Sequence, residues 1–357
     1  MSASPSMRAL VLERENMPFR DTSVARPVPG AGQVLVRVEA SGVNPLDLKI
    51  RNGSAPHARH PLPAVLGLDM AGVVHAVGPG VTAFKAGDEV YGLTGGVGGL
   101  QGSLAEFVAV DSHLLAPKPT NLAPREAAAI PLVFITAWEG LVDRVGLQAR
   151  QKVLVQGAGG VGQMVIQIAR AFGAGVFVTC RSVRQRLVEE LGATAIDPQQ
   201  NSVEEYVADH TQGHGFDVVY DTAGGTVLDS SFRAVRRFGH VVSSLGWGTH
   251  ELAPLSFRAA TYSGVFALLP LLTAEGRAHH GEILREATRL IEAGRVKPTV
   301  DPRHFNFDTV AEAYQTLEQQ DAAGKVVIDI ANHGPAAEVR RPARQAQAIN
   351  GPLKTKT

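Results

Sequence analysis

The chain has 357 residues, of which 45% are hydrophobic and 19% charged, and its formal net charge is zero. This length permits two domains, and the composition is that of a globular protein. The neutral balance gives no reason to expect nucleic acid or an anionic membrane as a partner. The sequence contains no run of about 18 apolar residues, and residues 1–8 lack the apolar core of a signal peptide, so we expect a cytoplasmic protein with a small-molecule substrate.

The sequence contains one cysteine, Cys180. A disulfide within the chain and a zinc site built from several cysteines are therefore excluded. The histidine pairs His57/His60 and His279/His280 lie in polar segments without further ligands, and we interpret them as solvated surface residues. The sequence thus predicts no metal site.

The first 123 residues are rich in short β-type runs separated by glycine and proline. Residues 7–12 and 32–40 have the composition and alternation of strands, and similar runs continue to residue 108. This pattern predicts an all-β, barrel-like N-terminal domain. Residues 41–49 form a loop that enters a short helix, with Pro45 in the first turn, where proline is tolerated.

From about residue 124 the composition becomes helical, and from Lys152 strands and helices alternate. In the first helix of this region, apolar residues recur every three or four positions and form one apolar face. Such alternation with short connections predicts a parallel sheet with helices on both sides. The predicted strands are 152–156, 175–180, 194–196, 216–220 and 240–245, and the predicted helices include 160–172, 183–191 and 228–237.

After residue 262 this alternation ends. Helices are predicted at 282–293 and 309–319, followed by a closing strand at 324–330, and we assign this portion to the first domain. The tail has no apolar period and is predicted to be disordered. The expected domains are 1–123 together with 264–330, then 124–263, then the tail 331–357.

A glycine motif, Gly157-x-Gly159-x-x-Gly162, lies between the strand at 152–156 and the helix that follows it. In a dinucleotide-binding unit the first glycine permits a tight turn, the second lets backbone approach a pyrophosphate, and the third allows close helix–strand packing. The pyrophosphate would bind at the helix N-terminus. A glycine-rich turn without a ligand is the alternative. The candidate cofactor-binding residues are Gly157, Gly159, Gly160, Val161 and Gly162.

The second strand of this unit ends at Cys180, where NAD-binding proteins usually carry an acidic residue that binds the ribose 2′-hydroxyl. A guanidinium and a hydroxyl suit the 2′-phosphate of NADPH, which a carboxylate would repel. Positive charge at a helix start opposes the helix dipole, so a bound anion explains it better than a solvated surface does. We therefore expect NADPH, with Cys180, Arg181, Ser182 and Arg184 as contacts.

The order of these parts resembles the medium-chain dehydrogenase/reductase superfamily, and within it the zinc-independent quinone oxidoreductase (zeta-crystallin-like) branch. The resemblance covers residues 7–330, nearly the whole chain. Zinc alcohol dehydrogenases hold a catalytic zinc with a Cys and a His–Glu pair, and here that neighbourhood contains Val43, Asn44, Leu68 and Asp69. The motifs that carry the resemblance are 42–47, 67–74, 132–138, 216–225 and 324–327.

This resemblance implies an α/β fold in which a Rossmann doubly wound parallel sheet is inserted into a β-rich GroES-like barrel domain. It implies a homodimer formed by pairing edge strands of two nucleotide-binding domains. It also places Ala223, Gly246 and Phe266 beside the cofactor, and Lys325 either beside the cofactor or in a pair with an acid.

Without zinc, the acceptors we expect are quinones and α,β-unsaturated carbonyls, since hydride addition to them produces a delocalised anion that needs few donors. Asn44 is the leading candidate donor, fixed by the proline after it, and Asp47 either orients that loop or belongs to the helix start. Thr136 is expected to start a helix beside the nicotinamide, as a ligand contact or as a cap. Tyr91 is either a proton donor or, more simply, a core residue.

Two segments are expected to shape the substrate pocket. Residues 92–102 are rich in glycine and are predicted to form a mobile lid, and residues 247–269 carry aromatic side chains that suit an apolar acceptor. Two other functions stay open at this point. The chain could be a zinc-free alcohol dehydrogenase or aldehyde reductase, or it could be a catalytically silent NADPH-binding protein.

Overall fold

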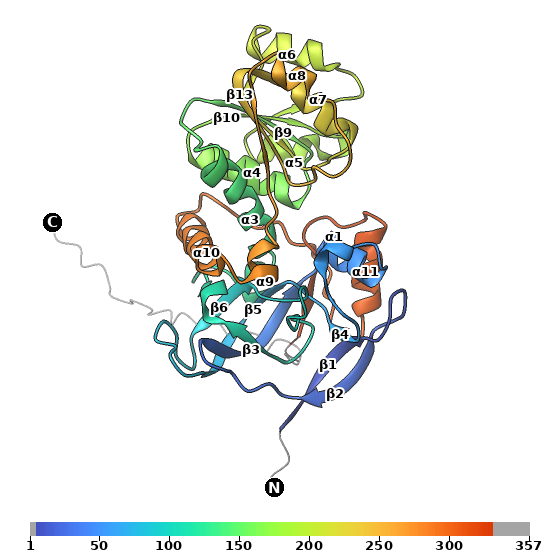
Figure 1. The fold of residues 1–357 in the computed structure, drawn as a ribbon, viewed down its shortest axis with the longest axis vertical. Coiled ribbons are helices and arrows are strands. Elements are labelled where there is room, and N and C mark those ends of the chain that lie inside the picture. The colour runs from blue at the N-terminus through green and yellow to red at the C-terminus, as the bar shows by residue number, and fades with distance from the viewer. Residues whose placement is uncertain (1–4, 331–357) are drawn as a thin grey trace, which may run out of the picture.

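Two separate sheet systems form two lobes, and the computed structural model describes residues 5–330 of the chain (Figure 1). In the lower lobe every strand pair is antiparallel. One sheet has the order β2-β1-β4, and the other has the order β15-β3-β5-β6-β8 with β7 also paired to β3. The strands are β1 (Ser6–Leu12), β2 (Arg20–Ala25), β3 (Gln33–Gly42), β4 (Ala64–Val65), β5 (Asp69–Val77), β6 (Glu89–Leu93), β7 (Phe107–Asp111), β8 (Leu115–Pro117) and β15 (Val327–Asp329).

The upper lobe contains a six-stranded sheet in the order β11-β10-β9-β12-β13-β14, and all of its strand pairs are parallel. This is the strand order of a Rossmann fold, whose ligands bind where the order reverses, here between β9 and β12. The predicted doubly wound parallel sheet is confirmed. The strands are β9 (Lys152–Gln156), β10 (Gly175–Thr179), β11 (Thr194–Ile196), β12 (Phe216–Asp221), β13 (Val235–Ser243) and β14 (Thr261–Gly264).

Helices cover the parallel sheet and fill the region between the lobes (Figure 1). The helices of the upper lobe are α4 (Gly160–Ala171), α5 (Gln185–Glu190), α6 (Val203–Thr211), α7 (Thr226–Ala234) and α8 (Ala253–Ser256). The others are α1 (Pro45–Arg51), α2 (Pro124–Ala127), α3 (Pro131–Trp138), α9 (Leu269–Thr273), α10 (Arg277–Glu292) and α11 (Val310–Glu318), with short η1 (Pro56–Ala58), η2 (Ser112–Leu114), η3 (Glu139–Arg144) and η4 (Ser182–Arg184).

One apolar core connects the two lobes through α3. It contains Val36 of β3 and Val155 of β9, and Phe134 and Trp138 of α3 belong to the same cluster. The rings of Phe134 and Trp138 stack with centroids 5.7 Å apart. Tyr220 of β12 donates a hydrogen bond of 2.6 Å to the Thr136 carbonyl, so α3 is also attached to the parallel sheet by a polar contact.

The main error in the predicted elements lies at the start of β13. We predicted helix to residue 237 and a strand from residue 240, but α7 ends at Ala234 and β13 begins at Val235. The ion pair from Arg236 to Asp217, with Nε 2.6 Å from Oδ1, holds the early part of this strand against β12. The predicted tail, 331–357, lies outside the described residues, and the predicted domain boundaries stay predictions.

Candidate active site and nucleotide-binding site

The glycine motif forms the turn from β9 into α4. Gly157 has φ of +101°, which requires glycine, and a Cβ at Gly162 would lie 2.0 Å from the Gly157 carbonyl oxygen. A Cβ at Gly159, by contrast, would have no neighbour within 4 Å. Because Gly159 precedes α4 and supplies no side-chain cap, the first N–H groups of the helix face this open space. This turn therefore fits the diphosphate of a dinucleotide, with Gly160 and Val161 in the first turn of α4.

The end of β10 carries positive charge and no carboxylate. Cys180 is buried, and burial raises the pKa of its thiol, with Asp197 and Glu189 adding to the effect. Arg181 and Ser182 are exposed, and Arg184 is partly exposed. The two arginines donate to uncharged oxygens, at Gln320 and at the Ala322 carbonyl. Within the described residues neither guanidinium pairs with an acid, so both are available to a phosphate.

A buried polar cluster joins strands of the lower lobe to α3. Asp69 is inaccessible to solvent and accepts hydrogen bonds from Asn44 Nδ2 (2.9 Å) and from Lys325 Nζ (3.1 Å). Lys325 also donates to Asn44 Oδ1. The other Asp69 oxygen accepts from the Leu132 N–H at the start of α3 (2.8 Å). The Asn44 amide is therefore oriented by Asp69 and Lys325, and these contacts use one of the two N–H groups on Nδ2.

Asp47 orients the loop that carries Asn44. Its carboxylate accepts from the Asn44 N–H (2.8 Å) and from the Gly67 N–H (3.2 Å), and the residue is fully buried. Burial, with a smaller contribution from the charge of Asp69, raises the pKa of Asp47 to about 7, although the two N–H groups and Lys325 oppose this shift. The two interpretations from sequence, helix start and loop orientation, describe the same geometry.

Two other candidate residues have their hydroxyls occupied. Thr136 does not start a helix, because α3 begins at Pro131, and its Oγ1 donates to the Leu132 carbonyl (2.7 Å). Tyr91 is fully buried and donates to the Leu284 carbonyl (2.7 Å), so it is a core residue. Burial raises the pKa of Tyr91 well above its usual value. His280 is also buried, on α10, which contradicts its interpretation as a surface residue.

The remaining cofactor candidates lie at the carboxyl ends of β12 and β13. The Ala223 N–H donates to Asp221, a buried acid that also accepts from Ser243 Oγ (2.7 Å). A Cβ at Gly246 would lie 2.1 Å from the Tyr262 hydroxyl, so only glycine fits beside that ring. Asp221 was not singled out from the sequence, although it ends a predicted strand, the position at which α/β folds place polar site residues.

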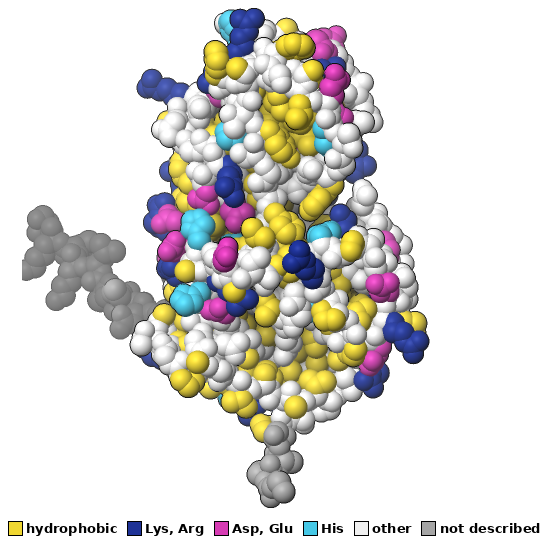
Figure 2. Space-filling view, in the orientation of Figure 1, with side chains coloured by type: hydrophobic (Ala, Val, Ile, Leu, Met, Phe, Trp, Pro, Cys, Tyr) yellow, Lys and Arg dark blue, Asp and Glu magenta, His cyan; other side chains and the backbone are white. Residues whose placement is uncertain are grey.

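A cavity of about 480 Å³ lies where the two lobes meet. Figure 2 shows hydrophobic side chains gathered in this region between the lobes. Gly246 and Phe266, predicted to lie beside the nicotinamide, are among the residues that line it. The other lining residues are His57, Arg59, Ser243, Ser244, Trp247, Tyr262, Gly264, Val265, Leu269, Leu272 and Thr273. His57 and Arg59 were not predicted to take part.

The predicted lid does not line this cavity, but it supports one wall. Residues from Gly92 to Val97 are buried, and the Gly98 N–H donates to the Ala58 carbonyl (2.9 Å). A Cβ at Gly98 would lie 3.1 Å from Leu272. The segment is thus packed between η1 and α9, so its glycines permit close contact.

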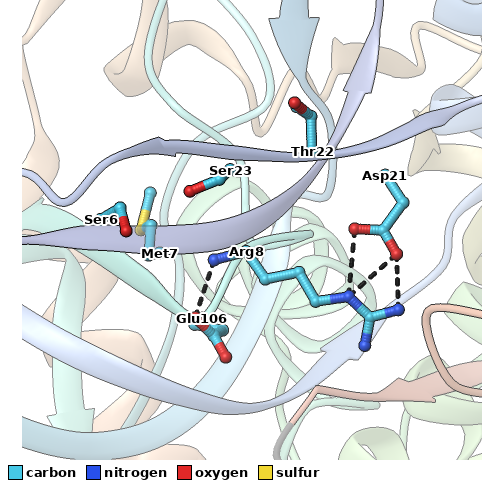
Figure 3. Close-up of a pocket in the computed structure, with 7 residues that line it drawn as sticks. All are labelled: Ser6, Met7, Arg8, Asp21, Thr22, Ser23 and Glu106. Atoms are coloured by element: carbon cyan, nitrogen blue, oxygen red, sulfur yellow. Dashed lines mark hydrogen bonds and ion pairs between the residues drawn. The ribbon is translucent and has the colours of Figure 1, made fainter.

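A second hollow, of about 300 Å³, lies on β1 and β2 at the far end of the lower lobe (Figure 3). Its charged groups already have partners within the protein. Arg8 Nε donates to both Asp21 oxygens (3.0 and 2.9 Å), and Glu106 accepts from the Arg8 N–H (2.7 Å). These paired charges make this surface a weaker candidate for a ligand site than the cavity between the lobes.

Two observations concern metals and membranes. Within residues 5–330, no three His, Cys, Asp or Glu side chains are grouped so that they could hold a metal ion. In the same part of the chain, none of the helices combines the length and the apolar character that crossing a membrane requires.

Comparison with known proteins identifies the family. An alcohol dehydrogenase GroES-like domain model matches residues 30–120, and a zinc-binding dehydrogenase model matches residues 191–328. The chain is 39% identical over 317 residues to 2-methylene-furan-3-one reductase of Solanum lycopersicum, which covers 86% of this chain and 74% of that protein. It is 38% identical over 317 residues to the chloroplastic NADPH-dependent alkenal/one oxidoreductase of Arabidopsis thaliana, covering 86% of this chain and 75% of that protein.

A solved structure agrees with this assignment. The crystal structure of an alcohol dehydrogenase superfamily protein from Novosphingobium aromaticivorans is 58% identical in sequence. It superposes with a TM-score of 0.89, covering 91% of this chain and 100% of that one. The β-rich lobe, the inserted parallel sheet, the glycine turn and these similarities agree. The chain belongs to the medium-chain dehydrogenase/reductase superfamily, in its quinone oxidoreductase-like branch.

Proposed function

We propose that the protein is an NADPH-dependent, zinc-independent oxidoreductase that transfers hydride to an α,β-unsaturated carbonyl or a quinone. The observation that carries this proposal is the pairing of a dinucleotide turn at Gly157–Gly162 with an aromatic cavity that contains Gly246 and Phe266. Relatives named as a furanone reductase and an alkenal/one oxidoreductase support the acceptor class.

NADPH is proposed on the charge around its expected 2′-phosphate. Arg181, Ser182 and Arg184 would hold the phosphate. The buried Cys180 occupies the position at which an acidic residue would repel it. Bound nicotinamide would supply the hydride. The N–H groups at the start of α4 would bind the diphosphate, with Gly159 allowing close backbone approach.

Lys325 is proposed to supply the positive charge near the reacting groups. Its ammonium is held by Asp69 and by Asn44, which fix where the charge lies. Negative charge that develops on the acceptor oxygen would be stabilised by such a preorganised cation. Asn44 and Asp47 then act by position, and Thr136 acts through its backbone contact with β12.

The test is NADPH oxidation with a panel of enones, quinones and simple aldehydes. We expect loss of reduced-nicotinamide absorbance with enones or quinones, and mass spectrometry should show that enones become saturated ketones. Turnover of simple aldehydes or alcohols alone would favour a zinc-free alcohol dehydrogenase. Tight NADPH binding without turnover would favour a silent binding protein. Retention of activity after chelation, with metal content measured, tests zinc independence.

A homodimer is also proposed, and a cytoplasmic location stays a prediction. Strand β14 is the edge of the parallel sheet and pairs with β13 on one side. Beside this edge, Phe238 is 77% exposed and Phe257 is 85% exposed. Large exposed apolar side chains next to an unpaired sheet edge are typical of an interface between subunits.

A further inference from the structure

The walls of the cavity between the lobes are apolar and aromatic. The His57 ring lies 5.2 Å from the Trp247 ring, and Trp247 lies 6.0 Å from Phe266. Burial, followed by the charge of Lys49, lowers the pKa of His57, which favours the uncharged ring. Another part of the wall comes from α9, whose Leu269 and Leu272 line the same space. These walls suit an uncharged, extended acceptor.

Arg59 contributes a charge at the edge of this apolar space. It is exposed, and among the described lining residues it is the one with a permanent charge. Within residues 5–330 its guanidinium has no hydrogen bond and no ion pair, and Glu275, just beyond α9, does not pair with it. A permanent cation without an acidic partner, beside an apolar pocket, is ready to bind an anion.

The backbone around Arg59 is fixed. Arg59 has φ of +47°, a left-handed conformation that non-glycine residues rarely adopt. The Arg59 N–H donates to the Pro56 carbonyl (3.2 Å), and the neighbouring Ala58 carbonyl accepts from Gly98 (2.9 Å). The root of the side chain is therefore held in place beside the cavity.

From this arrangement, and resting on the proposed function, we infer that the preferred acceptor carries an anionic group beyond its conjugated carbonyl, which Arg59 binds at the rim of the cavity. A carboxylate or a phosphate would serve, because both accept two parallel hydrogen bonds from a guanidinium. Arg59 is thus a specificity-determining residue, and it takes no part in hydride transfer.

The experiment compares acceptors of one chain length that differ at the far end. A neutral enone ends in methyl, a second ends in a carboxylate and a third in a phosphate monoester. For the native enzyme we expect a KM at least about tenfold lower for one or both anionic acceptors than for the neutral one. Arg59→Gln should remove that preference, while kcat and the KM for the neutral enone stay within about twofold of the native values. Arg59→Lys should keep part of the preference for the anionic acceptors. The preferred end group distinguishes carboxylate from phosphate recognition.

Arg150→Gln is the matched control. Arg150 is also an exposed arginine with positive φ (69°), and it lies in the turn before β9. The Arg150→Gln variant should leave the KM for every acceptor unchanged. A second measurement does not need turnover: a saturated keto acid should quench tryptophan fluorescence through Trp247, and Arg59→Gln should weaken its binding about tenfold.

The outcomes separate this inference from the proposed function. Reduction of the neutral enone without any preference for an anionic end overturns the inference alone. An equal rise in KM for neutral and anionic acceptors in Arg59→Gln, or a rise in the KM for NADPH, also overturns it. No reduction of any conjugated acceptor, together with no binding of the keto acid, overturns both.

Discussion

Lys325 Nζ lies 3.1 Å from Asp69 Oδ2, although the two residues are 256 positions apart in the sequence. The carboxylate of Asp69 is inaccessible to solvent, and the Lys325 side chain is 11% exposed. Both residues lie at strands that flank β3, so the antiparallel sheet brings the last strand of the described chain to the candidate active site.

Breaking this ion pair should cost much more than breaking a surface pair. Asp69→Asn leaves a largely buried ammonium without its counter-charge, and we expect a loss of about 3 kcal/mol or more in the free energy of unfolding. Lys325→Met should also destabilise, and the double variant should lose less than the sum of the two. Urea unfolding measures all three. Arg186→Met, which breaks the exposed Arg186–Glu190 pair, is the control and should change little. If the loss in the double variant equalled the sum of the two single losses, Asp69 and Lys325 would not stabilise the fold as a pair.

Asp47 should make stability depend on pH. Its pKa is raised to about 7 in the folded protein from an ordinary value of 3.8, so the folded state binds the proton more tightly. The protonated Asp47 carboxyl contributes its full amount to the free energy of unfolding below the unfolded pKa. This contribution is lost as the pH rises through the pKa of the folded state. Relative to Asp47→Asn, the native protein should therefore lose stability between about pH 4 and pH 7 and then level off. Urea unfolding at several pH values tests this, and a constant difference would refute it.

Two glycines of the turn should respond oppositely to alanine. In Gly162→Ala the new Cβ meets the Gly157 carbonyl oxygen at 2.0 Å, so we expect a destabilisation of about 2 kcal/mol, seen as a lower Tm. In Gly159→Ala the Cβ enters open space, so Tm should stay the same while NADPH affinity falls about tenfold. Calorimetric titration measures the affinity. Unchanged NADPH binding in Gly159→Ala would place the diphosphate elsewhere.

Arg181→Ala should reduce discrimination between NADPH and NADH. Loss of one charge-assisted contact to the 2′-phosphate should raise the KM for NADPH about tenfold or more and leave the KM for NADH nearly unchanged. Arg186→Ala removes another exposed arginine, in the next helix, and serves as the control. If both variants change the KM for NADPH equally, general surface charge rather than a phosphate site is responsible.

The proposed dimer should depend on the aromatic residues beside β14. The double variant Phe238→Glu, Phe257→Glu introduces two charges beside the edge, and sedimentation velocity should show a dimer for the native protein and a monomer for the variant. Val28→Glu is the control, because Val28 is also 85% exposed but lies in the N-terminal region. A dimer that persists in the double variant would place the interface on another surface.

The architecture was largely predictable because periodicity and turn residues are local properties. The strand 152–156 and the short strand 194–196 have the predicted bounds, and the glycine turn lies between strand and helix as expected. The start of β13 was missed because two consecutive arginines, Arg236 and Arg237, are typical of the exposed face of a helix. The strand is instead stabilised by the ion pair between Arg236 of β13 and Asp217 of β12.

The candidate site was harder to predict because its contacts join distant segments. Sequence singled out Asn44 and Lys325, but whether the Asn44 amide is free depends on Asp69 and on the sheet that brings them together. Asp69 was noticed only as a substitute for a zinc ligand. Arg59 carries no local signal, since its importance comes from a cavity whose other walls lie about two hundred residues further along the chain.

The attachment of α3 at both of its ends limits how this protein can be recombined with its relatives. Leu132 is bound to Asp69 below, and Thr136 is bound to Tyr220 above. A Cβ at Gly140 would lie 2.3 Å from the Tyr220 ring, so the helix continues into η3 directly against the parallel sheet. A chimera that exchanges the nucleotide-binding segment should therefore be joined before Pro131, because the contacts of Thr136 and Gly140 with Tyr220 then stay within one parent. The contact left between the parents runs from the backbone N–H of Leu132 to Asp69, so it requires only that the other parent also carries the aspartate. A junction inside 132–140 would divide the helix itself between the parents, and the inherited cofactor preference would be delivered to a misplaced acceptor cavity.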